Sequence, residues 1–239
     1  MDNIQTNTIL APATLEAEPE AKTKMSYALQ SRQRAQTLTF ALETIRAAMN
    51  DTEISALVQA HGYDAETLNA ALAMHTAAQD AFNARQQAIA AQKSLQGEWD
   101  IAYATARSEY VMLRDMARAL FKDESDQIAL GLKQRMPRDF EQFVPFARTT
   151  YAAARENAAY ADTLAARGFS AETLAAQANR LAALVDLYNA KTAATADAAR
   201  ATAERNRALD VLSVWLAEFT AVARFATRDR PDLYVKLGL

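Results

Sequence analysis

The chain contains two histidines, the side chain most often used for proton transfer and for binding transition metals. His61 directly precedes a glycine, where a basic side chain complements the partial negative charge at the end of a helix. His75 falls at an apolar seam position of a long predicted helix, which indicates a core or boundary imidazole. The Glu-x-x-His pattern of carboxylate-bridged di-iron bundles does not occur in the sequence. We therefore expect no metal site and no metal cofactor.

The second group that could do chemistry is a set of carboxylates near the middle of the chain: Glu98, Asp100, Glu109 and Asp115. A general acid and a general base must both reach the substrate, whereas residues two apart on a helix, such as Glu98 and Asp100, lie on different faces. We expect all four to be solvated. The sequence also contains no Cys, no Gly-rich phosphate loop and no nucleophile elbow. It therefore predicts no catalytic residue, no cofactor-binding residue and no enzymatic activity.

Basic side chains form three short clusters, each with acidic residues nearby. A nucleic-acid surface needs a broad region of positive charge, and this chain has a net charge of −3 and a pI of about 5.5. We expect solvated helix faces and no nucleic-acid partner. The clusters are Arg32-Gln33-Arg34, Lys133-Gln134-Arg135 with Arg138, and Arg205-Asn206-Arg207.

Three residues are candidates for contacting a partner protein: Trp99, Leu237 and Leu239. Trp99 lies beside the polar middle of a predicted long helix, where a large aromatic side chain would be uncovered, and aromatic side chains are frequent binding hot spots. Leu237 and Leu239 belong to an apolar C-terminal segment, where most chains are polar and frayed. We expect this segment either to pack on the end of its own bundle or to dock on another subunit.

The helices that must position these residues are marked by a repeated phrase. Residues 62–68 read GYDAETL, and residues 168–174, 106 positions later, read GFSAETL. In each phrase a glycine ends the preceding helix with a positive φ, and the side chain of an N-cap residue accepts hydrogen bonds from the first N–H groups of the next helix. An aromatic residue and a leucine have the spacing of a hydrophobic staple. These residues are Gly62, Asp64, Tyr63 and Leu68 in the first phrase, and Gly168, Ser170, Phe169 and Leu174 in the second.

Apolar residues match at the same offset along both halves of the chain, and both halves close in Leu-Gly-Leu, at residues 130–132 and 237–239. Matches in phase along a whole unit indicate a tandem duplication. We predict a helical repeat over residues 25–132 and a second one over residues 133–239, packed together as one bundle. Residues 1–24 are predicted to form a disordered acidic tail.

Within each repeat the sequence predicts a first helix, a short helix and a long helical region. The seam of the long region is apolar at both ends and polar in the middle, which fits either one continuous helix or a hairpin with its tip near Gly97 and, in the second copy, near Asp197. The heptad phase runs through the middle, which favours the continuous helix. The predicted ranges are Met25–Asn50, Thr52–His61 and Ala65–Lys122, and then Arg138–Asn157, Ala159–Arg167 and Ala171–Arg228.

Composition supports the helical interpretation, because Gly and Pro number only 5 each and alanine is abundant. We predict an all-α fold: an elongated, antiparallel, coiled-coil-like helical bundle built from a duplicated unit of about 106 residues. No segment has the uninterrupted apolar length of a membrane span, and the first residues lack the pattern of a secretory signal. The sequence therefore predicts a cytoplasmic protein without an integral membrane segment.

The leading functional hypothesis is a non-enzymatic structural or protein-interaction bundle that self-associates. Its expected partner is a second copy of the chain or another helical protein. Two alternatives remain open: a bundle that holds a small apolar ligand between its helices, and a secreted helical effector or toxin that acts at membranes.

Overall fold

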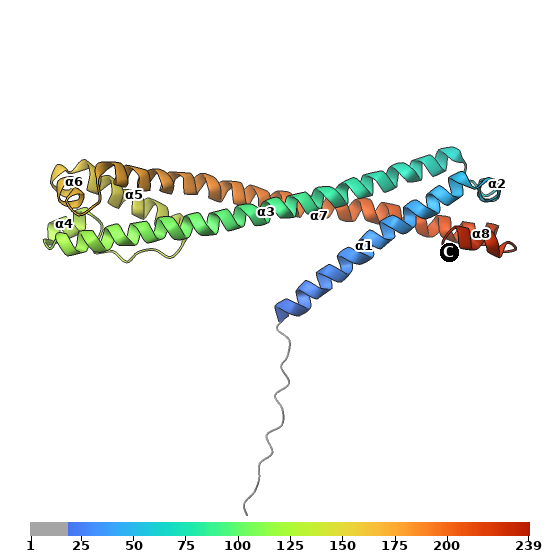
Figure 1. The fold of residues 1–239 in the computed structure, drawn as a ribbon, viewed down its shortest axis with the longest axis horizontal. Helices are drawn as coiled ribbons and strands as arrows, with labels where there is room; N and C mark the ends of the chain where they lie inside the picture. The colour runs from blue at the N-terminus through green and yellow to red at the C-terminus, as the bar shows by residue number, and fades with distance from the viewer. Residues whose placement is uncertain (1–18) are drawn as a thin grey trace, which may run out of the picture. The chain divides into compact units, whose positions relative to one another are not determined.

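A computed structural model describes residues 19–239, with side chains from residue 32 onward. This part of the chain contains helices and no strand, which confirms the all-α prediction. Figure 1 shows the helices in chain order. They are α1 (Pro19–Asn50), α2 (Thr52–Gln59), α3 (Ala65–Leu120), α4 (Glu124–Ala129), α5 (Phe140–Glu156), α6 (Ala158–Ala165), α7 (Ala171–Ala226) and α8 (Pro231–Lys236).

The first helix begins earlier than predicted, at Pro19 instead of Met25. A proline suits the first turn of a helix, because the N–H that it lacks would have no intrahelical partner there. Residues 19–24 of the predicted tail therefore belong to α1. The remainder of that prediction, for residues 1–18, lies outside the described residues.

Both long regions are continuous helices. The helices α3 and α7 have 56 residues each, so the hairpin alternative is wrong. Gly97 lies inside α3 without ending it. A glycine in a helix interior costs only about 1 kcal/mol relative to alanine, and the residues on both sides have high helix propensity.

Two six-residue helices, α4 and α8, are absent from the sequence-based prediction. Six residues are too few to show a helical period. Each helix is followed by a glycine in the left-handed region, Gly131 with φ 69° and Gly238 with φ 73°. The Leu-Gly-Leu phrase is therefore the C-terminal end of a short helix, where glycine takes the positive φ at low cost.

The described helices form two compact units. Unit 1 contains α1, α2, the part of α3 up to Ala81, the part of α7 from Asn206, and α8. Unit 2 contains the part of α3 from Phe82, then α4, α5 and α6, and the part of α7 up to Arg205. In each unit the parts of α3 and α7 run in opposite directions (Figure 1). Each unit therefore combines helices from both halves of the sequence.

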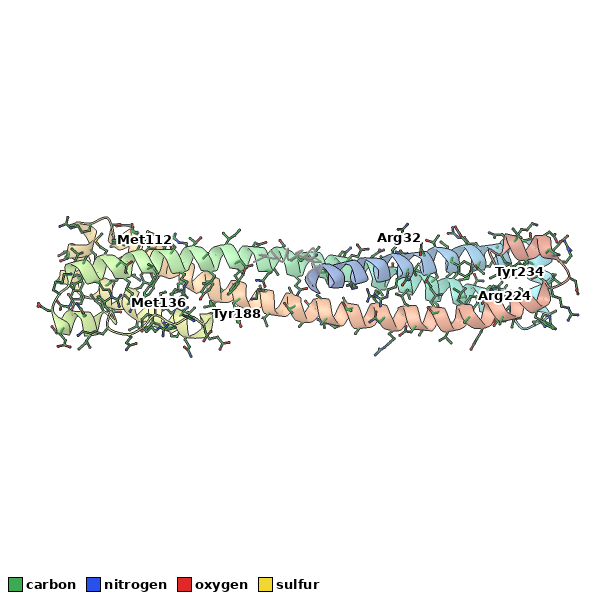
Figure 2. The ribbon with its side chains drawn as sticks, turned by 90° about the horizontal axis from the view of Figure 1, so that it is seen from below. Arg32, Met112, Met136, Tyr188, Arg224 and Tyr234 are labelled. Atoms are coloured by element: carbon green, nitrogen blue, oxygen red, sulfur yellow. The ribbon has the colours of Figure 1, made fainter. Side chains whose placement is uncertain are left out.

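The core of unit 1 centres on Phe219 of α7. Its ring stacks on Trp215 and meets the edge of the Tyr63 ring, both with centroids 5.0 Å apart. Ile54 of α2 is buried in the same cluster, as are side chains of α1, α3 and α8. Figure 2 shows Tyr234 of α8 and the α7 residue Arg224 at the same end of this unit.

The core of unit 2 centres on Tyr110 of α3, which is fully buried. Its ring makes edge-to-face contacts with Phe143, Phe146 and Tyr151, at centroid distances of 5.5 Å, 5.8 Å and 6.1 Å. Edge-to-face contacts of this kind hold aromatic side chains in defined positions. They fix α5 against α3.

The two repeated phrases are helix starts in the structure. Asp64 Oδ1 accepts a hydrogen bond of 2.8 Å from the Thr67 N–H, and Ser170 Oγ accepts one of 3.2 Å from the Thr173 N–H. The preceding glycines have φ values of 90° and 92°. The hydrogen bond from the Thr67 backbone lowers the pKa of Asp64. The aromatic residue and the leucine of each phrase pack into one cluster, Tyr63 with Leu68 in unit 1 and Phe169 with Leu174 in unit 2.

We expect Asp64→Ala to lower the melting temperature by roughly 2–4 °C, the shift typical of one lost N-cap in a chain of this size. The reason is that the first N–H groups of α3 lose their side-chain acceptor. Thermal unfolding followed by circular dichroism checks this result. Asp64→Ser, which installs the residue type of Ser170, is the matched control and should restore most of the loss. An alanine variant that melts with the wild type would contradict the capping role.

Candidate functional site

Each unit holds a Leu-Gly-Leu segment by the same hydrogen bond. Thr150 Oγ1 of α5 donates to the Leu130 carbonyl oxygen at 3.1 Å, and Thr44 Oγ1 of α1 donates to the Leu237 carbonyl oxygen at 3.1 Å. In unit 2 the Tyr110 hydroxyl also lies 3.1 Å from Thr150 Oγ1. Burial raises the pKa of Tyr110, so its phenol stays protonated at neutral pH. These buried bonds are structural and present no acid–base group to solvent.

Two arginines of α3 hold the chain that follows α4. Arg114 Nη2 donates to the carbonyl oxygens of Leu132, at 3.1 Å, and Gln134. Arg118 Nη2 donates to the Leu132 carbonyl oxygen at 2.6 Å. Burial lowers the pKa of Arg114, but a guanidinium keeps its proton in proteins. The pair is therefore a clamp on the backbone.

Trp99, the first partner-contact candidate, is half-buried in an aromatic cluster of unit 2. Its ring stacks on Tyr103 at 5.0 Å and meets the edge of Phe140 at 5.9 Å. Lys191 Nζ of α7 lies 4.0 Å from the Trp99 ring centroid, a cation–π contact. The position expected to be uncovered is thus covered by side chains of α5 and α7. Contact of Trp99 with a partner stays a prediction.

The other two candidates lie at the end of α8. Leu237 is 1% exposed and belongs to the core cluster of unit 1, and Leu239 is half-buried against the same cluster. The C-terminal segment was expected either to pack on its own bundle or to dock on another subunit. In the structure it packs on the helices of its own unit. Val235 of α8, two residues before Leu237, is 73% exposed.

The two histidines take part in packing. His75 is buried, and its Nε2 lies 3.1 Å from the carbonyl oxygen of Leu38. His61 is exposed after the end of α2 and meets the ring of Phe225 at a centroid distance of 5.4 Å. Each imidazole therefore has a local contact that explains its place.

The four carboxylates do not converge. Glu98 and Asp100 accept hydrogen bonds from side chains on their own helix, one turn earlier. Glu109 pairs with Arg180 of α7 at 2.6 Å, and Asp115 is exposed. Among the described side chains, residues 32–239, no three His, Asp or Glu side chains gather as a group that could hold a metal ion.

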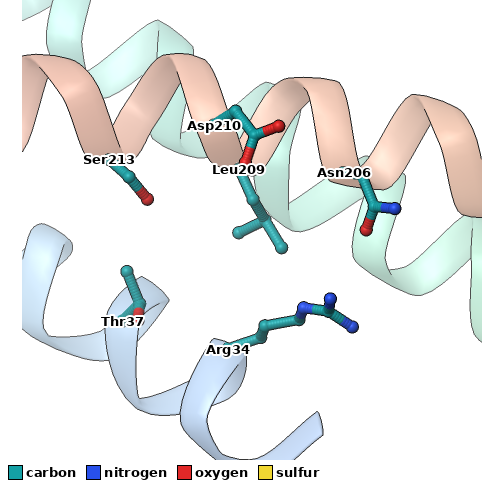
Figure 3. A pocket seen from close by; sticks show the side chains of 6 residues that line it. All are labelled: Arg34, Thr37, Asn206, Leu209, Asp210 and Ser213. Atoms are coloured by element: carbon teal, nitrogen blue, oxygen red, sulfur yellow. The ribbon is translucent and has the colours of Figure 1, made fainter. Parts of the chain in front are cut away.

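A polar cavity of about 310 Å³ lies between α1 and α7 in unit 1, a volume suited to a small ligand. Arg34 and Asn206 lie at one end and Thr37 and Ser213 at the other (Figure 3). The sequence did not predict this site, because Arg34 and Asn206 belong to short basic clusters that were expected to be solvated. The lining residues are Arg34, Thr37, Asn206, Leu209, Asp210 and Ser213.

Unit 2 has a smaller cavity of about 210 Å³ between α3 and α7. Its walls are mainly alanine and leucine side chains, as expected where small residues face each other across a helix seam. The lining residues are Ala102, Thr105, Arg180, Ala183, Leu184 and Leu187.

The last part of α7 carries apolar side chains on the side that faces away from the core. Val211 is 50% exposed and Val214 is 61% exposed, whereas Leu212 is fully buried. Arg207 and Glu218 are exposed on the same side of the helix, at spacings of four residues from Val211 and Val214. We call Arg207, Val211, Val214 and Glu218 the exposed stripe of α7. Sequence periodicity did not single it out.

Comparison with known protein families, with curated proteins and with solved structures gives no match for this chain. Within residues 19–239, none of the helices has both the length and the apolar character needed to cross a membrane.

The candidate sites are therefore compared by the side chains that they present. The exposed stripe can bind a complementary helix, because apolar side chains with flanking charges are the pattern of helix-pairing surfaces. The polar cavity can bind a small molecule with matching charges. The buried hydrogen bonds and the arginine clamp stabilise the fold.

Proposed function

We propose that this chain is a non-enzymatic helical interaction protein that self-associates through the exposed stripe of α7. The observation that carries the proposal is a pair of valines, 50% and 61% exposed, opposite the buried face of their helix. Apolar side chains at spacings of three and four residues, flanked by opposite charges, are the features by which helices pair. Arg207 and Glu218 have no ion-pair partner within the described part of the chain.

The order of charges favours a second copy in antiparallel orientation. When two α7 helices pair about a point between Leu212 and Ser213, Val211 of one copy faces Val214 of the other. Arg207 of one copy then faces Glu218 of the other, and the two-fold axis repeats both contacts. A parallel pair would instead set like charges against each other, which is destabilising. The antiparallel pair is an isologous contact, which closes at two copies.

The stripe consists of four side chains of one helix, so we expect a small contact of modest strength. Interfaces well below about 1,200 Å² of buried area form weak or transient complexes, and exposed ion pairs add only about 0.2–1 kcal/mol each. We expect a dissociation constant of roughly 0.1–1 mM. The association is suited to a protein held at high local concentration.

A charge swap tests the pairing. Glu218→Arg alone should weaken dimerisation at least tenfold, because Arg207 then faces an arginine of the second copy, and Arg207→Glu alone should do the same. The double variant Arg207→Glu/Glu218→Arg should restore it, since the two charges have only exchanged places. Sedimentation equilibrium of the full chain measures all four proteins.

The matched control is Arg224→Glu, which reverses an exposed charge on the same helix outside the stripe. It should leave the dissociation constant within about twofold of the wild type. Equal weakening by the control variant, or a double variant that stays as weak as the single ones, would contradict the antiparallel stripe contact.

A tandem duplication with exchanged ends is part of this proposal. Support comes from equal helix lengths, eight residues in α2 and α6 and 56 residues in α3 and α7. It also comes from the two equivalent threonines, each of which binds the Leu-Gly-Leu segment of the other repeat. Coiled-coil-like packing and a cytoplasmic location belong to the proposal as well. The absence of Cys fits a reducing compartment.

The alternative of a small apolar ligand is supported by the cavity between α3 and α7 in unit 2, which is lined mainly by alanine and leucine side chains. Its volume of about 210 Å³ is below the roughly 300–1,000 Å³ typical of ligand pockets. Self-association is therefore the function that we prefer.

A further inference from the structure

The polar cavity of unit 1 has a counterpart in unit 2 that is filled with side chains. Tyr103 of α3 contacts Phe140 and Phe143 of α5, with ring centroids 5.9 Å and 5.8 Å apart. Arg107 lies over the Phe143 ring at 5.5 Å and donates from Nη1 to the Tyr103 hydroxyl at 3.0 Å. Three rings and one guanidinium thus close the space between α3 and α5.

The positions equivalent to these four, at the offset of 106, line the cavity of unit 1. Arg34 and Thr37 stand where α5 has its two phenylalanines, and Leu209 and Ser213 stand where α3 has its tyrosine and arginine. Every ring is replaced by a side chain without one. The same helical frame therefore leaves a cavity of about 310 Å³ in unit 1.

The side chains around the cavity carry balanced charge. Arg34 supplies a cation and Asp210 an anion, and neither side chain has an ion-pair partner within the part of the chain that the structure describes. Thr37 Oγ1 donates to the Gln33 carbonyl oxygen at 3.0 Å, so its lone pairs can accept a further bond. The cavity therefore offers one positive charge, one negative charge and hydroxyl groups. These groups are complementary to a ligand that carries both a negative and a positive charge.

We propose that this cavity binds a small zwitterion of the free amino acid class. The ligand carboxylate would pair with Arg34, at the end of the cavity where the Asn206 amide also lies (Figure 3). The ligand ammonium would pair with Asp210, and Ser213 with Thr37 would accept from or donate to polar groups of the ligand side chain. Binding at this cavity rests on the positional correspondence of the proposed duplication and is independent of the stripe contact.

The test is calorimetric titration of the full chain with each of the common L-amino acids at about 5 mM, above the roughly millimolar dissociation constants of weak ligands. At least one should bind. Arg34→Leu should weaken that binding at least tenfold, and Asp210→Asn should also weaken it, because each removes one charge-assisted contact. Arg32→Leu is the matched control, since it removes an exposed arginine of α1 outside the cavity.

Absence of binding for every amino acid would overturn the proposal. So would binding that the Arg32 and Arg34 variants weaken equally, or binding of inorganic phosphate alone, which would indicate an anion site instead. Circular dichroism spectra of the variants establish that they are folded. The mass of the protein in solution is a separate readout, so failure of this proposal and failure of the self-association proposal are distinguishable.

Discussion

Phe219→Ala is expected to destabilise unit 1 by about 3–5 kcal/mol, the usual cost of removing a fully buried phenylalanine side chain. Phe219 is fully buried, stacks on the Trp215 ring and makes an edge-to-face contact with the Tyr63 ring. Truncation leaves a cavity that two rigid rings cannot fill. Denaturant unfolding followed by the fluorescence of Trp215, in chains where Trp99 is replaced by Phe, measures the effect in unit 1.

Phe225→Ala is the control for this prediction. Phe225 lies on the same helix and is 56% exposed, so its removal should cost no more than about 0.5–1 kcal/mol. Equal destabilisation by the two variants would mean that Phe219 does not occupy the centre of a packed core.

The second large effect is expected for Leu237→Ala, at about 2–4 kcal/mol. The Leu237 side chain is 1% exposed in the core of unit 1, and its carbonyl oxygen accepts the buried bond from Thr44. The substitution removes the apolar contact and leaves the backbone acceptor in place. The same fluorescence measurement in denaturant reports the loss.

Val235→Ala is matched to it, two residues away on α8 and 73% exposed. It should change the free energy of unfolding by less than about 0.5 kcal/mol. A Leu237 variant as stable as the Val235 variant would show that the segment does not pack on unit 1 in solution. A loss that grew with dilution would instead assign the segment to a contact between copies.

Local chemistry made the helix starts predictable. A glycine, an N-cap side chain and a hydrophobic staple act within a few residues. A motif of seven residues is therefore enough to predict where α3 and α7 begin. Continuity of the long helices was also readable from the heptad phase. The six-residue helices α4 and α8 were not, because a single turn and a half shows no period.

Tertiary arrangement explains most of what the sequence did not reveal. The offset of 106 aligns Thr44 with Thr150, but it does not predict that each threonine binds the Leu-Gly-Leu segment in the other half of the chain. Trp99 was expected at an uncovered position because its own helix is polar there. The side chains that cover it, Phe140 and Lys191, come from α5 and α7.

The candidate binding surfaces illustrate the same limit. Val211 and Val214 fit an apolar periodicity in the sequence. Only the structure shows that Leu212 and Phe219 face the core, so that the two valines lie on the exposed side of α7. The sequence does contain an indication of the cavity. At the offset of 106, Phe140 and Phe143 align with Arg34 and Thr37. In the proposed duplication, the absence of these two rings from the first half of the chain indicates either a cavity at that place or a different packing neighbour.

Association of the chain with a second copy of itself can be measured by sedimentation equilibrium of the wild-type protein. Samples from about 0.05 mM to above 1 mM bracket the expected dissociation constant. We predict that the average mass rises with concentration from 26.2 kDa towards twice that value and then levels off, because an isologous contact closes at two copies. A mass of 26.2 kDa at every concentration would contradict self-association, and growth past the dimer would contradict the closed antiparallel pair.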